Sequence, residues 1–194
     1  MKIIDITRNA QEAPLYPGTP VPEIERISDV NKGDAYTVSR YVFTTHLGTH
    51  ADAQSHFLPG SSVKNIEQMP LDRFYGPARV ITVPQNALIA KKDLQGRIDG
   101  TERIVLHSGG KSYFSKEAAD YLVAAGIKTI VTDAWSVAPH NNEKEIHHIL
   151  LGAEIGIVEN VILDGVEDGD YVLSAFPIKI KGADGAPVRA VLIK

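Results

Sequence analysis

Three of the seven histidines of this 194-residue chain lie within eleven residues of one another, with an aspartate among them. They are His46, His50 and His56, and the acid is Asp52. All four positions are even, so an extended strand would project them from one face. In a helix, His46 would share a face with His50, and Asp52 with His56. Either backbone conformation brings imidazoles and a carboxylate to one point.

Imidazole nitrogens and carboxylate oxygens suit zinc, manganese or iron. A set of two histidines and one aspartate leaves coordination positions open, as catalysis requires. Gly48 permits a bend or a close backbone approach, and Thr49 can hold a ligand in place by hydrogen bonding. The competing interpretation is a set of solvated loop histidines. Clustered imidazoles need partners, so the pattern favours a metal site.

The composition narrows the class of protein. Apolar residues make up 43% and charged residues 23% of the chain, which is typical of a soluble globular protein. A net charge of −4 gives no support for a nucleic-acid partner. No apolar run approaches the roughly 20 residues that cross a bilayer, so no membrane association and a cytoplasmic location are expected. The absence of cysteine excludes disulfides, thiolate ligands and a cysteine nucleophile.

Short strand patterns run along the chain between turns rich in proline and glycine. The segment APLYPGTPVPE contains four prolines, which favour an ordered loop or an extended edge. The C-terminal segment YVLSAFPIKIKGADGAPVRAVLIK predicts two strands joined by a turn at GADG. Further strands are predicted at Lys2–Thr7, Tyr36–His46, Ala78–Val83 and Arg103–His107.

One helix carries signals at both ends. In SKEAADYLVAAG, Ser115 can cap the helix and Gly126 can end it. The strand KTIVTDA follows, so Arg103–His107, this helix and that strand form a β–α–β unit. A second helix is expected around Glu145–Leu151. The sequence therefore predicts one domain, residues 1–194, with a mixed α/β (α+β) fold of many strands and few helices.

The stretch HLGTHADAQSH resembles the motif HxGTHxDxPxH of the cyclase family, which includes bacterial kynurenine formamidases and manganese-dependent isatin hydrolases. Four further segments are similar to the family in the same order: IDIT…PLYPGTP, HFLPGSSVKNIEQMPLDRFYGPARVI, VTDAWSVAP and FPIKIKGADGAPVRAVLI. The resemblance thus covers nearly the whole chain. It implies a three-layer, swivelling β/β/α fold. It also implies homodimers or larger assemblies with pocket walls near the subunit interface.

The resemblance implies a second group of metal ligands. The family carries a histidine before a Leu-Leu pair and a glutamate twelve residues after that histidine. Here HHILLGAEIGIVEN supplies His147 and Glu159 at that spacing, which His148 fails. Two cations some 3.5–4 Å apart repel unless an anion lies between them, so a bridging carboxylate is reasonable. The implied ligands are His46, His50 and Asp52 for one ion, and Asp52, His147 and Glu159 for the other.

The implied cofactor is one or two divalent ions, zinc before manganese, and the implied proton-transfer residue is His56. Two positions depart from the family pattern. Gln54 replaces the proline of the motif, and its amide can contact substrate. Tyr16 stands where kynurenine formamidases tend to have a tryptophan that packs on the aromatic substrate. Both are expected to bind substrate, and both leave its identity open.

The expected function is metal-dependent hydrolysis of a small amide or formamide, with arylformamidase activity of the N-formylkynurenine type as the leading interpretation. The first alternative keeps the metal and changes the reaction, to lactam opening as in isatin hydrolase, or to cyclisation or dehydration. The second is a metal-stabilised binding protein without turnover, which would leave no open coordination position. The expected partners are a small-molecule substrate and further copies of the chain.

Overall fold

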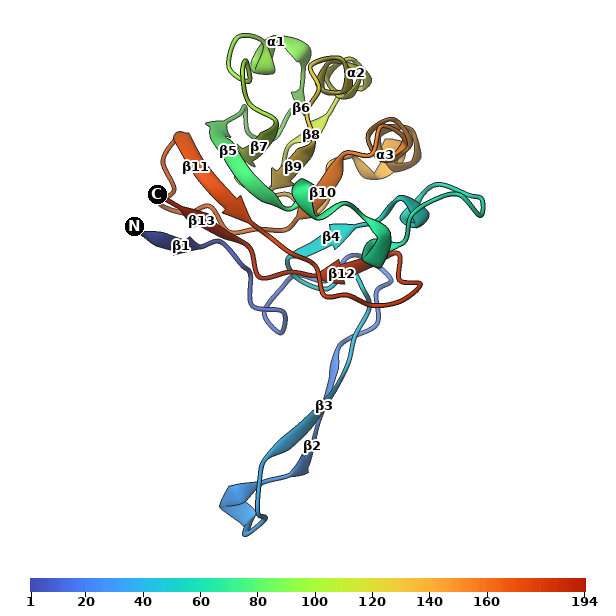
Figure 1. Ribbon diagram of the computed structural model, residues 1–194, viewed down its shortest axis with the longest axis vertical. Coiled ribbons are helices and arrows are strands. Elements are labelled where there is room, and N and C mark those ends of the chain that lie inside the picture. The colour runs from blue at the N-terminus through green and yellow to red at the C-terminus, as the bar shows by residue number, and fades with distance from the viewer.

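The computed structural model describes residues 1–194, and its body is built on one curled sheet of nine strands (Figure 1). The strand order is β1-β13-β11-β5-β7-β9-β10-β4-β12. Strands β5, β7, β9 and β10 run parallel at the centre, and the flanking pairs are antiparallel. The strands are β1 (Ile3–Asp5), β4 (His50–Asp52), β5 (Tyr75–Thr82), β7 (Arg103–His107), β9 (Thr129–Thr132), β10 (Gly156–Glu159), β11 (Gly169–Ser174), β12 (Gly185–Pro187) and β13 (Val191–Ile193).

The central strands are apolar on both faces because each face covers a separate core. Successive strand residues point to opposite sides. Ile104 and Ile157 therefore pack into the core beneath the helices, whereas Val105 and Val158 pack into the core on the other side. Burial on both faces explains why these segments read as continuous apolar runs rather than as alternating ones.

The three α-helices of the chain lie on one side of the sheet (Figure 1). The Ser115 hydroxyl accepts a hydrogen bond from the Ala118 N–H at 3.2 Å at the start of the second helix, and Gly126 follows its end with φ +74°. Strands β7 and β9 are parallel neighbours, so the predicted β–α–β unit is confirmed. The helices are α1 (Lys91–Leu94), α2 (Lys116–Ala124) and α3 (Glu143–Gly152). Short 3-10 helices are η1 (Val30–Lys32), η2 (Gln54–His56), η3 (Ile66–Gln68), η4 (Leu71–Arg73) and η5 (His140–Asn142).

A two-stranded arm extends away from the body (Figure 1). It consists of β2 (Glu23–Ser28) and β3 (Val38–Val42), and no residue in either strand is buried. The strand predicted for Tyr36–His46 is thus shorter than expected, and His46 lies in the turn after it. The pairing strand β2 was not predicted. A further small sheet pairs β6 (Leu88–Ile89) with β8 (Tyr113–Phe114).

The C-terminal segment differs from the predicted pair of strands. It forms three strands, of which β11 and β13 pair with each other while β12 pairs with β4 at the far edge of the sheet. Only residues 188–190 separate β12 from β13, so the chain between them spans roughly 14 Å at most. Because β12 and β13 belong to opposite ends of the strand order, the sheet must curl until these ends approach. None of the helices combines the length and the apolar character needed to cross a membrane.

Candidate metal centre

Strand pairing gathers three of the expected ligands on the helix-covered face of the sheet, and a helix adds a fourth. His50 and Asp52 lie two residues apart on β4 and therefore share a face. Strand β4 pairs with β10, in a register that places Glu159 directly opposite His50. Cross-strand partners project to the same side, so Glu159 joins them. Helix α3 covers this face, and its His147 is 2% exposed.

The distances within this group fit shared ligation of an ion better than hydrogen bonding. The Nε2 atom of His50 lies 3.5 Å from Asp52 Oδ1 and 3.5 Å from Glu159 Oε2. The Nε2 atom of His147 lies 3.8 Å from Asp52 Oδ2 and 3.6 Å from Glu159 Oε1. Such separations are too long for hydrogen bonds. Two ligands that each lie about 2.1 Å from one ion, at a tetrahedral angle, are about 3.4 Å apart.

Backbone carbonyls fix the orientation of both imidazoles. His50 Nδ1 lies 2.9 Å from the Gly48 carbonyl oxygen, and His147 Nδ1 lies 2.8 Å from that of Glu143. A carbonyl only accepts, so each Nδ1 carries the proton and each Nε2 lone pair points into the cluster. Gly48 has φ +63°, and a Cβ there would lie 3.1 Å from the Ala10 Cα atom, so glycine serves both predicted roles.

An unsatisfied carboxylate oxygen supports the same interpretation. Asp52 is fully buried, and its Oδ2 atom has no hydrogen-bond donor. A buried charge without a partner is costly in free energy. A cation beside Asp52 Oδ2 removes that cost, so the donor set present here fits a divalent ion.

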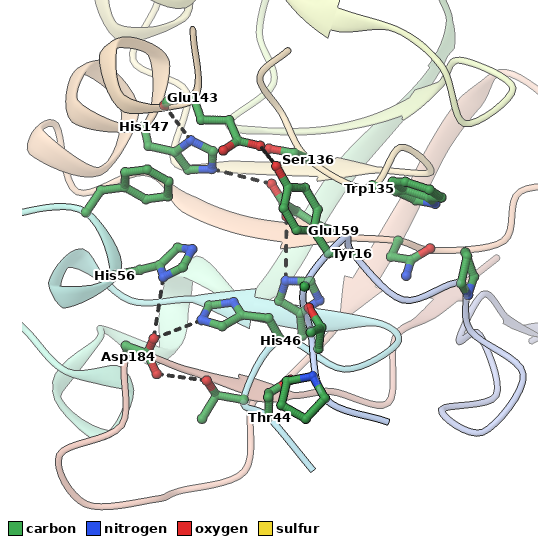
Figure 2. A pocket seen from close by; sticks show the side chains of 18 residues that line it. Tyr16, Thr44, His46, His56, Trp135, Ser136, Glu143, His147, Glu159 and Asp184 are labelled. Carbon is green, nitrogen blue, oxygen red and sulfur yellow. Dashed lines mark hydrogen bonds and ion pairs between the residues drawn. The ribbon is translucent and has the colours of Figure 1, made fainter. Parts of the chain in front are cut away.

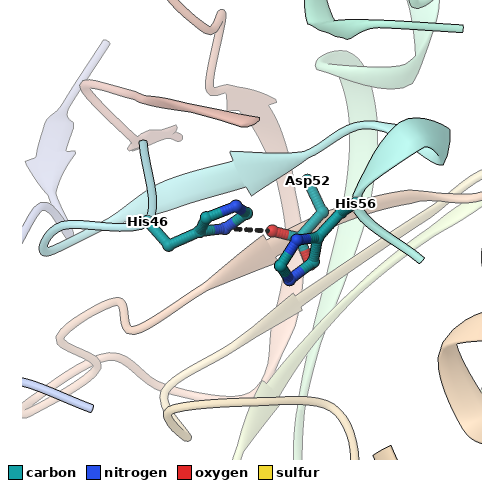
Figure 3. A group of neighbouring side chains, drawn as sticks. All are labelled: His46, Asp52 and His56. Atoms are coloured by element: carbon teal, nitrogen blue, oxygen red, sulfur yellow. Dashed lines mark hydrogen bonds and ion pairs between the residues drawn. The ribbon is translucent and has the colours of Figure 1, made fainter. Parts of the chain in front are cut away.

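His46 and His56 complete the cluster around Asp52 (Figure 3). His46 Nδ1 lies 3.0 Å from Asp52 Oδ1, and the His56 ring stacks on the His46 ring with centroids 3.9 Å apart. The side chains form two sets whose ligand atoms lie within 4.8 Å of one another, His46 with Asp52 and His56, and His50 with Asp52 and Glu159. Asp52 is common to both sets. His50 is grouped with Glu159 rather than with His46.

Both buried carboxyls of the cluster are held in the ionised form. Burial raises the pKa of the Asp52 and Glu159 carboxyls, but the histidines that face them hold both pKa values below their usual range. Burial lowers the pKa of His46, and its hydrogen bonds to Asp184 and Asp52 outweigh this and raise that pKa to about 10. The two buried carboxylates therefore attract positive charge, which a divalent cation supplies.

A cavity of about 500 Å³ opens above these side chains (Figure 2). Its aromatic wall contains Tyr16, Phe57 and Trp135, of which Trp135 is 41% exposed. The Tyr16 hydroxyl donates to Glu143 Oε1 at 2.7 Å and also contacts His140 Nδ1. Burial and the Glu143 carboxylate raise the pKa of Tyr16 to about 12, so its hydroxyl stays protonated at neutral pH. The cavity size suits a small aromatic molecule.

Residues 4–139 match the family model described as "Putative cyclase". The chain belongs to this cyclase family. The kynurenine formamidase of Maricaulis maris is 32% identical to it over 205 residues, which cover 98% of this chain and 97% of the relative. That of Bacillus anthracis is 34% identical over 204 residues, with 98% and 97% coverage. The family predicted from the histidine motif is therefore confirmed.

Solved structures of cyclase-family proteins share the fold. A potential metal-dependent hydrolase with cyclase activity superposes with a TM-score of 0.85 at 24% identity, over 98% of this chain and 96% of that one. Isatin hydrolase A from Labrenzia aggregata gives a TM-score of 0.83 at 22% identity, over 98% and 93%. The predicted mixed α/β, cyclase-like fold is confirmed.

Gln54 lies away from the place expected for a substrate-binding residue of this cyclase-family chain. Its side chain is buried and does not line the cavity. Gln54 Nε2 donates to the Leu151 carbonyl at 2.9 Å, and its Oε1 accepts from the Lys64 N–H at 3.0 Å. Both ends of the amide are thus engaged, and Gln54 ties η2, which carries His56, to the end of α3.

Two acidic residues at the cavity were missed by the sequence analysis. Glu143 positions the Tyr16 hydroxyl, as described above. Asp184 Oδ2 lies 3.0 Å from His46 Nε2 and 3.4 Å from His56 Nδ1 (Figure 2). Asp184 belongs to the segment GADG, whose composition indicates only a turn. Its closeness to histidines some 130 residues earlier arises from strand pairing that no local pattern reveals.

Proposed function

We propose that this chain is a metal-dependent hydrolase of small aromatic amides, and that N-formyl aromatic amines such as N-formylkynurenine are its substrates. The convergence of three imidazoles and two carboxylates at and beneath the floor of an aromatic-walled cavity carries this proposal. Its relatives at 32–34% identity over nearly the full length are kynurenine formamidases. They confirm the predicted enzyme class, a hydrolase of C–N amide bonds.

The metal would be held by the buried cluster. We expect zinc, with manganese as the alternative, because imidazole and carboxylate ligands accept both. One or two ions per chain are consistent with the two sets of ligand atoms that share Asp52. When bound, such an ion polarises the amide carbonyl and lowers the pKa of its water from 15.7 to about 7. The proposed ligands are His46, His50, Asp52, His147 and Glu159.

The side chains of the protein perform the remaining steps. Burial lowers the pKa of His56, so its imidazole is neutral at pH 7 and can accept a proton. We assign to it the transfer of a proton from the attacking water to the leaving nitrogen. Tyr16 and Trp135 offer aromatic faces that stack on the aryl ring of the substrate. Glu143 accepts a hydrogen bond from the Tyr16 hydroxyl and so keeps the Tyr16 ring in the wall of the cavity.

A substrate screen tests this function. Protein loaded with zinc or with manganese is assayed on N-formylkynurenine, on isatin and on a simple aliphatic amide, with release of the amine or ring opening followed by absorbance. We expect N-formylkynurenine to be hydrolysed with a kcat/KM at least about tenfold above that for the other two. A chelator should abolish the activity, and added metal should restore it.

The two alternative functions predict different results in this screen once a hydroxy acid is added as a fourth substrate. Faster opening of isatin would assign the chain to lactam hydrolysis. Dehydration or ring closure of a hydroxy acid, without amide hydrolysis, would assign it to the cyclase or dehydratase reactions. Tight metal binding with no turnover of any substrate would indicate a metal-stabilised binding protein. Any of these three results contradicts the arylformamidase proposal.

We also propose that the chain forms a homo-oligomer through its β2–β3 arm. Ile24 faces Tyr41 across the arm, and these side chains are 47% and 52% exposed. On the neighbouring pair of positions, Glu25 and Arg40 form an exposed ion pair at 2.9 Å. An isolated two-stranded ribbon is at best marginally stable in water. A second copy that covers the Ile24–Tyr41 face would stabilise the arm.

Light scattering, which measures the molar mass of the protein in solution, tests this oligomer proposal. We expect the wild-type chain at twice its monomer mass or more, and the Ile24→Asp/Tyr41→Asp double variant at the monomer mass. Leu71→Asp is the matched control, because Leu71 is an apolar residue 66% exposed on the body. It should keep the wild-type mass. A monomeric wild-type protein would contradict the proposal.

A further inference from the structure

Asp184 occupies a fixed place beside the metal cluster. Gly185, the next residue, pairs with Asp52 in the ladder between β12 and β4. The Asp184 carbonyl accepts a hydrogen bond from the Ala53 N–H at 2.9 Å, so the backbone on both sides of its side chain is held by β4 and its extension. The Thr45 hydroxyl donates to Asp184 Oδ1 at 2.8 Å and holds the carboxylate itself. Although its side chain is 44% exposed, Asp184 is not a freely moving surface acid.

The second oxygen of this carboxylate faces two functional histidines. Asp184 Oδ2 lies 3.0 Å from His46 Nε2 and 3.4 Å from His56 Nδ1 (Figure 2). The other nitrogen of His46, Nδ1, lies 3.0 Å from Asp52 Oδ1 and is thereby directed into the ligand cluster. His46 thus points one nitrogen at the proposed metal and the other at a carboxylate. Carboxylates in this position orient a metal-binding imidazole and increase its basicity.

Gly185 makes this close approach possible. A Cβ atom at that position would lie 2.7 Å from His46 Cε1 and 2.9 Å from the Ala51 carbonyl oxygen. Any side chain there would push the ring of His46 away from the turn that carries Asp184. Gly185 therefore leaves room for the His46 imidazole, and Asp184 accepts the hydrogen bond from its Nε2–H.

We propose that Asp184 is a positioning residue that holds the metal ligand His46 and the proton-transfer residue His56 in fixed relation to each other. This inference rests on the proposed hydrolase function. The two rings stack with an interplanar angle of 28°, so a shift of either imidazole displaces the other. One carboxylate oxygen, shared between His46 Nε2 and His56 Nδ1, sets the position of both. Its removal should weaken metal binding and slow proton transfer together.

The test compares three variants. Asp184→Ala removes the carboxylate, and Asp184→Asn keeps an oxygen that can accept from His46 but removes the charge. Asp168→Asn is the matched control, because Asp168 also accepts from a threonine hydroxyl, at 2.7 Å, and its side chain is 46% exposed. Zinc affinity is measured by competition with a chromophoric chelator. The values of kcat and KM are measured with an N-formyl aromatic amine.

We expect Asp184→Ala to bind zinc about 10–100-fold more weakly and to lose about 10–100-fold in kcat at saturating zinc, with little change in KM. Asp184→Asn should fold like the wild type and lose less of both, and Asp168→Asn should lose neither. Wild-type zinc affinity and kcat in both Asp184 variants would overturn the inference and leave the hydrolase proposal intact. If the Asp184 variants bind zinc more weakly but the wild type hydrolyses no amide, the result would support the positioning of His46 and contradict the proposed function.

Discussion

Asp52→Ala is expected to abolish metal binding and to lower kcat/KM by about 10³-fold or more. Asp52 is fully buried, and it belongs to both sets of possible ligand atoms. Without Asp52, strand β4 contributes no negative charge to the site formed by His46, His50 and His147. Loss of the several kcal/mol of charge stabilisation that a metal supplies corresponds to about three orders of magnitude in rate. Elemental analysis after dialysis and the rate of formamide hydrolysis measure the two effects.

The isosteric variant Asp52→Asn separates shape from charge. Its amide fills the same space and keeps one oxygen that can bind a metal, so we expect partial metal retention and a smaller loss of rate. Circular dichroism should show that both variants keep the wild-type secondary structure, because the strand pairing of β4 with β10 and β12 involves only the backbone. If both variants keep the wild-type metal content, Asp52 is not a metal ligand.

The parts of the fold that follow local rules could be predicted from the sequence. Ser115 and Gly126 mark the ends of α2 by capping chemistry that is independent of the rest of the chain. The apolar run at Arg103–His107 forms the strand β7 with the predicted bounds. The expected helix at Glu145–Leu151 is α3, which is longer by two residues at its start and one at its end.

Elements that lack a burial pattern, and elements that pair with distant strands, were missed. The arm strand β2 has no apolar core of its own, so its sequence carries no burial pattern that would indicate a strand. The sequence predicts two strands joined by a turn at GADG, whereas in the structure β12 pairs with β4. The register between strands could not be predicted either. Glu159 lies opposite His50 because of how β4 pairs with β10, and the spacing of residues along the sequence does not determine that pairing.

Some residues of the candidate site could be predicted from the local sequence, and others could not. The histidine motif identified His46, His50, Asp52 and His56 because they are close in sequence, and the structure places them together. His147 and Glu159 are far from the histidine motif in the sequence, and only the family resemblance predicted them as ligands. Gln54 departs from the expectation because its amide turns toward α3, although His56, two residues later, lines the cavity.

His56→Ala is expected to keep its metal and to lose about 10²–10⁴-fold in kcat, with little change in KM. The His56 side chain is 28% exposed and lines the cavity, and burial holds its pKa below the usual range, so it is ready to receive a proton. His148→Ala is the matched control, because His148 lies on α3 outside the cavity. It should retain the wild-type rate. Steady-state kinetics and metal analysis on the same samples measure both variants.

The metal content of His56→Ala decides between two roles that the geometry allows. His56 lies in one set of ligand atoms with His46 and Asp52, so its imidazole is within reach of an ion as well as of the cavity. A proton carrier leaves the metal affinity unchanged when it is removed, whereas a ligand does not. Added imidazole should restore part of the rate, because removal of the ring leaves a space that opens to the cavity. Loss of metal in His56→Ala would make His56 a ligand, and an unchanged kcat would leave the proton transfer to another group.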